Sequence, residues 1–387
     1  MKSKSQEPLI REYLYGKYTR PKNYLNELGY RVEFEKQKEI RKIYLEVTDR
    51  CNLNCAICYR KSWDEKDMDR DMTDETLEKV YRDMESLEGI QKIVLGGIGE
   101  PFYHPRILDV IHRLKEYPLH ITTNGTLLTE EIIEALTGTV QEITVSIDGI
   151  GEAFCDIRGI GLDGITEGIR ALQKRKKEND TAYPKISIQF VASKTNIDQI
   201  FNVIDLSSEM GCREVIVSHL IPQSDEKKND YLYGFHTGQE KKLKRLWHDI
   251  MQHAKIKNIS VQLPSITLQT ERECPFIEDV TTYITAGGDV VPCYRFSHPY
   301  EEYVFGRKKR VQKHSFGNIH EKTLLNIFNS KEYRNFRYTI HCNFYPSCMD
   351  CDLVDGCEYP MTTEEDCYGV RPTCADCLWA RKFVSCP

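Results

Sequence analysis

The sequence predicts an α/β protein, a partial (β/α)6 barrel followed by a small cysteine-rich domain. Between residues 41 and 235, six short runs rich in Ile, Val and Thr alternate with longer stretches of helical spacing. Such alternation is typical of parallel strands joined by right-handed crossovers, and six units favour an open barrel over a closed one of eight. Nine of the 15 cysteines fall within residues 293–386, in a region of irregular pattern.

The predicted strands are short apolar runs bounded by turn residues. They span 42–48, 90–97, 119–125, 141–149, 185–193 and 213–222. The first intervening helix is expected to begin at Thr73, because Thr-Asp-Glu is a common helix start. Cys, a Gly-rich turn, Asn-Gly and Asp-Gly follow the first four strands in turn. Functional residues at the carboxyl ends of strands are typical of barrel enzymes.

The chain divides into four parts by composition. We expect a polar lead-in at 1–40, the partial barrel at 41–235, a linker helix region at 236–269 and the cysteine-rich domain at 270–387. A chain of 387 residues has room for two domains.

Charge and hydropathy exclude several classes of protein. The net charge of -6 gives no reason to expect a nucleic-acid partner. No run of about 18 uncharged apolar residues predicts a membrane span. The charged N-terminus does not resemble a secretory signal. We therefore expect a cytoplasmic protein, in which clustered cysteines indicate metal or redox chemistry rather than disulfides.

Cys51, Cys55 and Cys58 form a C-x3-C-x2-C array directly after the first predicted strand. Cysteine thiolates hold iron–sulfur clusters, usually four to a cluster. Three ligands leave one iron of a 4Fe–4S cubane open, and an open metal position is where a substrate or cofactor binds. A zinc site or three buried thiols is the alternative interpretation.

With this array and the motifs that follow it, the sequence resembles the radical S-adenosylmethionine superfamily over residues 42–222. The resemblance implies that the open iron chelates the methionine part of S-adenosylmethionine and that electron transfer into the sulfonium breaks a C–S bond. The three cysteines are then the catalytic, radical-generating group. No acid or base for the substrate can be assigned.

The segment GGIGEP at 96–101 resembles the methionine-binding glycine motif of that superfamily. Glycines let a backbone approach a ligand closely, and the fork of Arg158 suits the methionine carboxylate. The implied cofactor-binding residues are Gly97, Gly99, Glu100, Pro101, Asn124, Ser146, Asp148 and Arg158. The alternatives are ordinary turns at the Gly, Asn-Gly and Asp-Gly positions and a surface role for the arginine.

The C-terminal region predicts a β-hairpin at 281–296 that turns at Gly287-Gly288 and delivers Cys293 on its return strand. Residues 317–337 predict a turn followed by an amphipathic helix. Cys155 and Cys212 stand alone in the barrel region, where we expect small core residues rather than ligands.

The C-terminal cysteines resemble the SPASM extension, which implies two auxiliary 4Fe–4S clusters. We allot one cluster to Cys274, Cys293, Cys342 and Cys367. The other is allotted to Cys348, Cys351, Cys357 and Cys377. Cys374 and Cys386 are left spare. A structural zinc ribbon is the alternative for this region.

Auxiliary clusters suit a reaction with net electron removal, so we expect radical maturation of a peptide, protein or cofactor, with electrons from a ferredoxin or flavodoxin. Three segments, at 96–105, 217–222 and 372–387, resemble the maturases that accompany tungsten-dependent aldehyde ferredoxin oxidoreductases. That resemblance implies a role in modifying the tungsten–pyranopterin cofactor of a target oxidoreductase.

Peptide or protein maturation is the alternative enzymatic function, by thioether or C–C crosslinking or by formylglycine-type oxidation. Many peptide maturases carry a leader-binding domain of about 80 residues before the barrel, and the 40 residues here are too few to fold as one. The non-enzymatic alternative is a zinc-ribbon binding protein. An iron and sulfide count separates the iron–sulfur enzyme, of either kind, from the zinc protein.

Overall fold

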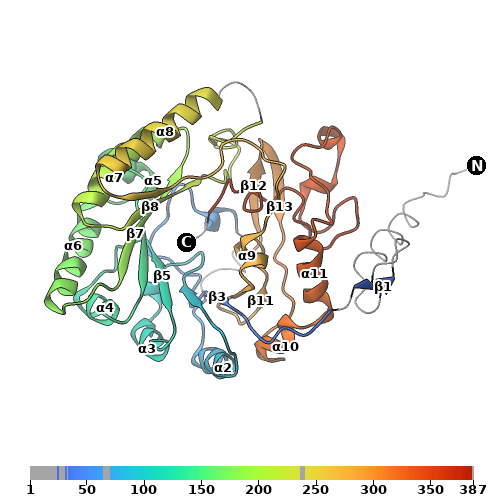
Figure 1. Ribbon diagram of the computed structural model, residues 1–387, viewed down its shortest axis with the longest axis horizontal. Coiled ribbons are helices and arrows are strands. Elements are labelled where there is room, and N and C mark those ends of the chain that lie inside the picture. The colour runs from blue at the N-terminus through green and yellow to red at the C-terminus, as the bar shows by residue number, and fades with distance from the viewer. Residues whose placement is uncertain (1–23, 26–30, 33, 64–69, 236–239, 386–387) are drawn as a thin grey trace, which may run out of the picture.

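The computed structural model describes residues 24–25, 31–32, 34–63, 70–235 and 240–385 (Figure 1). Its centre is a nine-stranded sheet with the order β11-β10-β3-β4-β5-β6-β7-β8-β9. Neighbouring strands from β3 to β8 all pair in parallel. Figure 1 shows helices α2, α3, α4, α6, α7 and α8 along the outer side of this curved sheet. The predicted fold class, a partial α/β barrel with a cysteine-rich C-terminal region, is confirmed.

The six predicted strands lie where the apolar runs placed them. They are β3 (Lys42–Leu45), β4 (Lys92–Leu95), β5 (Leu119–Thr123), β6 (Glu142–Ser146), β7 (Lys185–Ala192) and β8 (Glu214–His219). The helices that cover them are α2 (Asp74–Glu85), α3 (Ile107–Arg113), α4 (Glu130–Leu136), α5 (Gly151–Arg158), α6 (Asp163–Glu178), α7 (Ile200–Glu209) and α8 (Glu240–Ile256). The predicted start of the first helix is confirmed, because the Thr73 side chain accepts a hydrogen bond from the Thr76 amide.

Three further strands extend the sheet beyond the predicted six. β9 (Ser260–Gln262) pairs in parallel with β8, and β10 (Thr281–Ile284) pairs in parallel with β3. β11 (Val290–Val291) completes the predicted hairpin, antiparallel to β10. Gly288, at the turn, has a φ of +82°, which favours glycine. The C-terminal region is therefore joined to the barrel by its own hairpin, which continues the barrel sheet.

The rest of the C-terminal region is mostly irregular. Its helices are α9 (Pro275–Glu278), α10 (Leu324–Phe328) and α11 (Lys331–His341), and its hairpin strands are β12 (Tyr300–Val304) and β13 (Arg307–Val311). The single helix predicted within 317–337 is wrong. The structure has two, because α10 ends at Phe328 and the Ser330 side chain caps a new helix by accepting from the Tyr333 amide.

Short elements complete the described chain. They are β1 (Tyr24–Leu25), β2 (Arg31–Val32) and the 3-10 helices η1 (Tyr59–Ser62), η3 (Pro101–Tyr103), η4 (Ile197–Gln199), η5 (Tyr294–Phe296), η6 (Val354–Gly356) and η7 (Tyr359–Met361). Most of the predicted lead-in at 1–40 lies outside the described residues. Within the described ranges, no helix combines the length and apolar character that crossing a bilayer demands.

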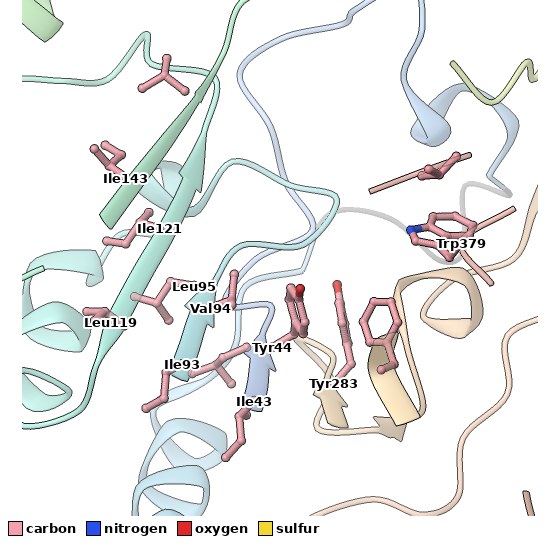
Figure 2. Close-up of a cluster of buried hydrophobic side chains, with 14 of the residues drawn as sticks. Ile43, Tyr44, Ile93, Val94, Leu95, Leu119, Ile121, Ile143, Tyr283 and Trp379 are labelled. Carbon is pink, nitrogen blue, oxygen red and sulfur yellow. The ribbon is translucent and has the colours of Figure 1, made fainter. Parts of the chain in front are cut away.

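One hydrophobic core runs through the barrel and the C-terminal region. Figure 2 shows Tyr44 and Tyr283 side by side, on neighbouring strands β3 and β10. Their ring centroids are 6.1 Å apart and their planes nearly parallel, and both side chains are buried. Parallel strands that are buried on both faces appear in a sequence as near-continuous apolar runs. The sequence pattern therefore predicted the positions of these strands. The shared core fixes the C-terminal cysteines relative to the barrel.

Candidate active site and iron–sulfur centres

A cavity of about 250 Å³ lies at the carboxyl ends of the barrel strands. Each strand from β3 to β8 contributes to its wall, either with residues of the strand itself or with residues of the loop that follows it, as is typical of barrel enzymes. The structure brings together nine residues that the sequence predicted for one site, namely Cys51, Cys55, Cys58, Gly97, Gly99, Glu100, Asn124, Ser146 and Arg158. Of the predicted set, Pro101 and Asp148 do not line the cavity.

The three cysteines of the first loop are held by contacts with neighbouring segments. The Ala56 amide donates to the Ile157 carbonyl at 2.7 Å, which ties the loop to α5. Two side chains donate to the sulfurs: Asn124 Nδ2 lies 3.7 Å from Cys51 Sγ, and Arg158 Nη1 lies 3.8 Å from Cys55 Sγ. Both contacts favour sulfur in its negatively charged form.

Burial makes the free thiolates unfavourable in this loop. It raises the pKa of Cys51 to about 11 and also raises the pKa of Cys58. A bound metal removes this cost, because a coordinating thiol is deprotonated outright. Three half-buried or buried thiols, two of which accept from side-chain donors, therefore fit a metal cluster.

Gly99 is required by the close packing of the glycine motif against the cysteine loop. A Cβ at this position would collide with the backbone carbonyls of Thr48 and Arg50. The Glu100 amide also donates to the Arg50 carbonyl at 2.8 Å. The glycine motif therefore positions the chain that leads into Cys51, in addition to lining the cavity.

Glu100 is a buried carboxylate in the cavity wall. It accepts hydrogen bonds from the Thr123 hydroxyl and the Asn124 amide, each at 2.7 Å, and from the Phe102 amide at 3.2 Å. Burial nevertheless raises its pKa to about 7. Such a group favours a cationic ligand. Pro101, the next residue, is buried at the start of η3 and does not line the cavity.

Asp148 lies behind the cavity, where it holds Arg158. Arg158 Nε donates to Asp148 Oδ2 at 2.6 Å, and the other carboxylate oxygen accepts from the Val191 amide at 2.8 Å. The Asp148 side chain is fully buried. Asp148, expected among the cofactor-binding residues, thus contacts Arg158, which does line the cavity.

The C-terminal cysteines are grouped differently from the expected allotment. Cys274, Cys293, Cys374 and Cys377 line a second, small cavity together with apolar side chains and Arg295. Burial raises the pKa of Cys374, and charge on each of the other three thiols raises it further. Cys342 instead lies at the end of α11, where its amide donates to the Tyr338 carbonyl. Cys374, expected to be spare, takes the position that Cys342 was expected to fill.

Cys348, Cys351, Cys357 and Cys367 form the second group. Burial raises the pKa of Cys348 to about 12, and charge on Cys367 contributes. Burial also raises the pKa of Cys367, as does charge on Cys357 and Cys351. This group keeps three members of the expected set and exchanges Cys377 for Cys367.

Four thiols are the usual donor set of a cubane cluster. Among the described residues, no three His, Cys, Asp or Glu side chains are arranged to hold a single metal ion. Of the two isolated cysteines, Cys212 is buried as expected, whereas the expectation for Cys155 is wrong because it is exposed. Cys386 lies outside the described residues.

The sequence did not single out several cavity residues, which come from outside the motifs. Trp63, His298, Tyr300 and Trp379 all line the cavity. The rings of Trp63 and His298 stack with centroids 4.0 Å apart, and His298 Nε2 donates to Glu46 at 2.8 Å. These residues lie far apart along the chain, so no local spacing could have revealed them.

Comparisons with known proteins agree with this geometry. The family described as "Radical SAM superfamily" matches residues 45–188, and the SPASM "Iron-sulfur cluster-binding domain" matches residues 274–352. A "Tungsten-containing aldehyde ferredoxin oxidoreductase cofactor-modifying protein" of Pyrococcus furiosus is 38% identical over 350 residues, covering 89% of this chain and 96% of the relative. A probable GTP 3′,8-cyclase of Pyrococcus horikoshii is 29% identical over 53% of this chain and 65% of its own length.

The fold also matches a solved structure, that of Streptococcus suis SuiB bound to precursor peptide SuiA. The TM-score is 0.59 and the sequence identity 16%, with 88% of this chain and 76% of the other covered. The likeness at this identity concerns the fold alone. The 38% identical relative and the two family matches lead to one conclusion: the chain belongs to the radical S-adenosylmethionine superfamily and is an enzyme of that superfamily with a SPASM iron–sulfur domain.

Proposed function

We propose that this enzyme modifies the cofactor of a tungsten-containing oxidoreductase. The observation that carries the proposal is the relative from Pyrococcus furiosus, whose name states that activity and which matches this chain over 89% of its length and 96% of the relative's. The match extends past the barrel into the cysteine-rich region, where substrate-facing residues such as Trp379 lie.

The radical-generating site is proposed to be Cys51, Cys55 and Cys58. A cluster held by these thiols would supply the electron for reductive cleavage of S-adenosylmethionine. The chain's own residues orient that cofactor. The Arg158 guanidinium, fixed by Asp148, presents its fork to the methionine carboxylate.

The methionine ammonium, on the same carbon as the carboxylate, is positively charged and suits an acidic partner. The Glu100 carboxylate is buried in the cavity wall and has no cationic partner among its hydrogen bonds, which come from Phe102, Thr123 and Asn124. We assign it to the methionine ammonium. Ser146, at the end of β6, and Asn124 complete the polar wall that would face the ribose.

The auxiliary centres are proposed to be two 4Fe–4S clusters. The first uses Cys274, Cys293, Cys374 and Cys377, and the second uses Cys348, Cys351, Cys357 and Cys367. Each set supplies the four thiolates that a cubane needs. Electrons come from a ferredoxin or flavodoxin, and a cytoplasmic location suits free thiols. We propose four parts for the chain, at 1–40, 41–235, 236–269 and 270–387.

The test is to produce a tungsten oxidoreductase in an anaerobic host with and without this protein. The matched control carries Cys51→Ala, Cys55→Ala and Cys58→Ala, which leaves the auxiliary cysteines in place. We expect an altered cofactor mass and higher oxidoreductase activity only with the unaltered chain. Identical cofactors in all three preparations would reject the target. Formation of 5′-deoxyadenosine by the purified enzyme is measured separately. The radical chemistry is then tested on its own, even if the tungsten oxidoreductase is rejected as the target.

A further inference from the structure

Arg295 is a buried cation with unused hydrogen-bond donors. Its side chain is only 1% exposed. Nη2 donates to Glu302 and, at 2.9 Å, to Asp376. Nε and Nη1 are buried and find no acceptor among the described residues. Buried donors without partners are rare and costly, so a guanidinium with two unused N–H groups calls for an acceptor.

Arg295 lines the small cavity together with Cys274, Cys293, Cys374 and Cys377, here called the first thiol group. The missing acceptor belongs to this cavity. A buried water is poorly suited here, because it needs two to four polar partners and the other lining side chains are apolar (Phe276, Ile277, Pro292, Phe296, Phe336 and Trp379).

The charges around Arg295 are balanced without the thiols. Lys309 Nζ pairs with Asp376 Oδ2 at 2.6 Å, so two cations face the two carboxylates of Glu302 and Asp376. All four side chains are almost completely buried. Arg295 and Lys309 together neutralise Glu302 and Asp376, and the Nε and Nη1 donors of Arg295 are not used in these pairs, so they remain available to an acceptor on the sulfur side.

We propose that Arg295 donates N–H···S hydrogen bonds to the cluster held by Cys274, Cys293, Cys374 and Cys377, and so raises its midpoint potential. The inference rests on the proposed auxiliary cluster at those thiols. Reduction adds negative charge to a cluster, and a cation with donors aimed at its sulfurs stabilises the reduced form; net charge and hydrogen bonds to sulfur are known determinants of the potential.

The other edge of Arg295 leads to the active-site cavity. Glu302 Oε2 accepts a hydrogen bond from the Tyr300 hydroxyl at 3.1 Å, and Tyr300 lines the cavity of the radical site. One guanidinium thus connects the substrate side of the enzyme with the first thiol group. A raised potential makes that cluster a better acceptor for an electron leaving the substrate.

The experiment compares two double variants in the full-length reconstituted protein. Arg295→Met with Glu302→Gln removes the donors, and Lys309→Met with Glu302→Gln removes the same charges but keeps Arg295. Asp376 keeps one cationic partner in each. In redox titrations followed by EPR, we expect only the first variant to lower the midpoint potential. The expected shift is at least 59 mV, which for one electron is a tenfold change in the equilibrium constant for reduction of the cluster.

Equal shifts in the two double variants would reject the hydrogen bonds in favour of general charge, and no shift with intact iron content would reject the role of Arg295. A second measurement uses unaltered protein labelled with ¹⁵N-arginine. Pulsed EPR of the reduced cluster is expected to show a ¹⁵N coupling that Arg295→Lys removes, and absence of the coupling in the unaltered chain overturns the proposal.

The cluster itself is tested apart from Arg295. Cys374→Ala with Cys377→Ala should lower the iron content by about four atoms. An unchanged iron content would reject the auxiliary cluster and the Arg295 contact together. An unchanged potential in a variant that keeps its iron rejects the contact alone.

Discussion

Asp148 holds Arg158 at the edge of the active-site cavity, with 2.6 Å between Asp148 Oδ2 and Arg158 Nε. The same guanidinium lies 3.8 Å from the sulfur of Cys55. Asp148, which does not line the cavity, thus fixes Arg158, which does. The pair connects the cysteine loop with the end of β6. The relationship makes Asp148 a positioning residue, and it leads to the first of four predictions.

Asp148→Asn should weaken S-adenosylmethionine binding by about tenfold, or 1.4 kcal/mol. The amide cannot hold the Arg158 fork with a charge-assisted pair, so the guanidinium loses its orientation. Equilibrium binding to the reconstituted enzyme measures the effect. Glu178→Gln, which alters an exposed pair with Arg175, serves as the control. Unchanged affinity in an Asp148→Asn protein with full iron content would contradict the assignment.

Gly99→Ala should prevent assembly of the radical-generating cluster. The added methyl group overlaps the backbone of Thr48 and Arg50, so the chain leading into Cys51 must shift. We expect lower iron content and no 5′-deoxyadenosine. Gly164→Ala is the matched control, because a methyl group there meets no atom within 4 Å and the residue lies in helix α6, where alanine is favoured. Similar iron content in both variants would show that the close approach is not essential.

Glu100 should make the iron-free protein less stable as the pH rises from about 4.5 to about 7. Its pKa is raised from 4.5 to about 7 by burial. The folded state therefore holds the proton more tightly than the unfolded state, and its stabilisation is complete below pH 4.5 and lost as the pH passes 7. The loss is on the order of 3 kcal/mol.

Urea unfolding of the unaltered chain and of Glu100→Gln, from pH 4.5 to 8, measures this contribution. The difference in unfolding free energy between the two proteins should change between pH 4.5 and 7 and stay constant above, because other titrating groups cancel. A difference that is independent of pH would show that Glu100 keeps an ordinary pKa.

Cys374→Ala and Cys342→Ala should have opposite outcomes for iron binding. Cys374 lies with Cys274, Cys293 and Cys377, whereas Cys342 does not line that cavity. We expect Cys374→Ala to lose about four irons and Cys342→Ala to keep them all. Iron and sulfide analysis with Mössbauer spectroscopy gives the count. The reverse result would restore the grouping expected from the sequence.

Short-range patterns were enough for much of the fold and for the centre of the site. The six barrel strands followed from apolar runs that are buried on both faces, and the hairpin at Gly288 followed from its turn residues. The spacing of Cys51, Cys55 and Cys58 placed three thiols on one loop. Each of these features depends on residues that are neighbours along the chain, and local geometry therefore encodes them.

Packing of distant segments decided the rest. Cys374 joins Cys274 across 100 residues, and Trp63 meets His298 only because the C-terminal hairpin extends the barrel sheet. The pairing of Arg295 with Glu302 and Asp376 likewise depends on three segments meeting in one buried place. Spacing along a chain carries no information on such contacts, because many arrangements of the same segments satisfy the same local preferences, and only the burial of a common core selects one of them.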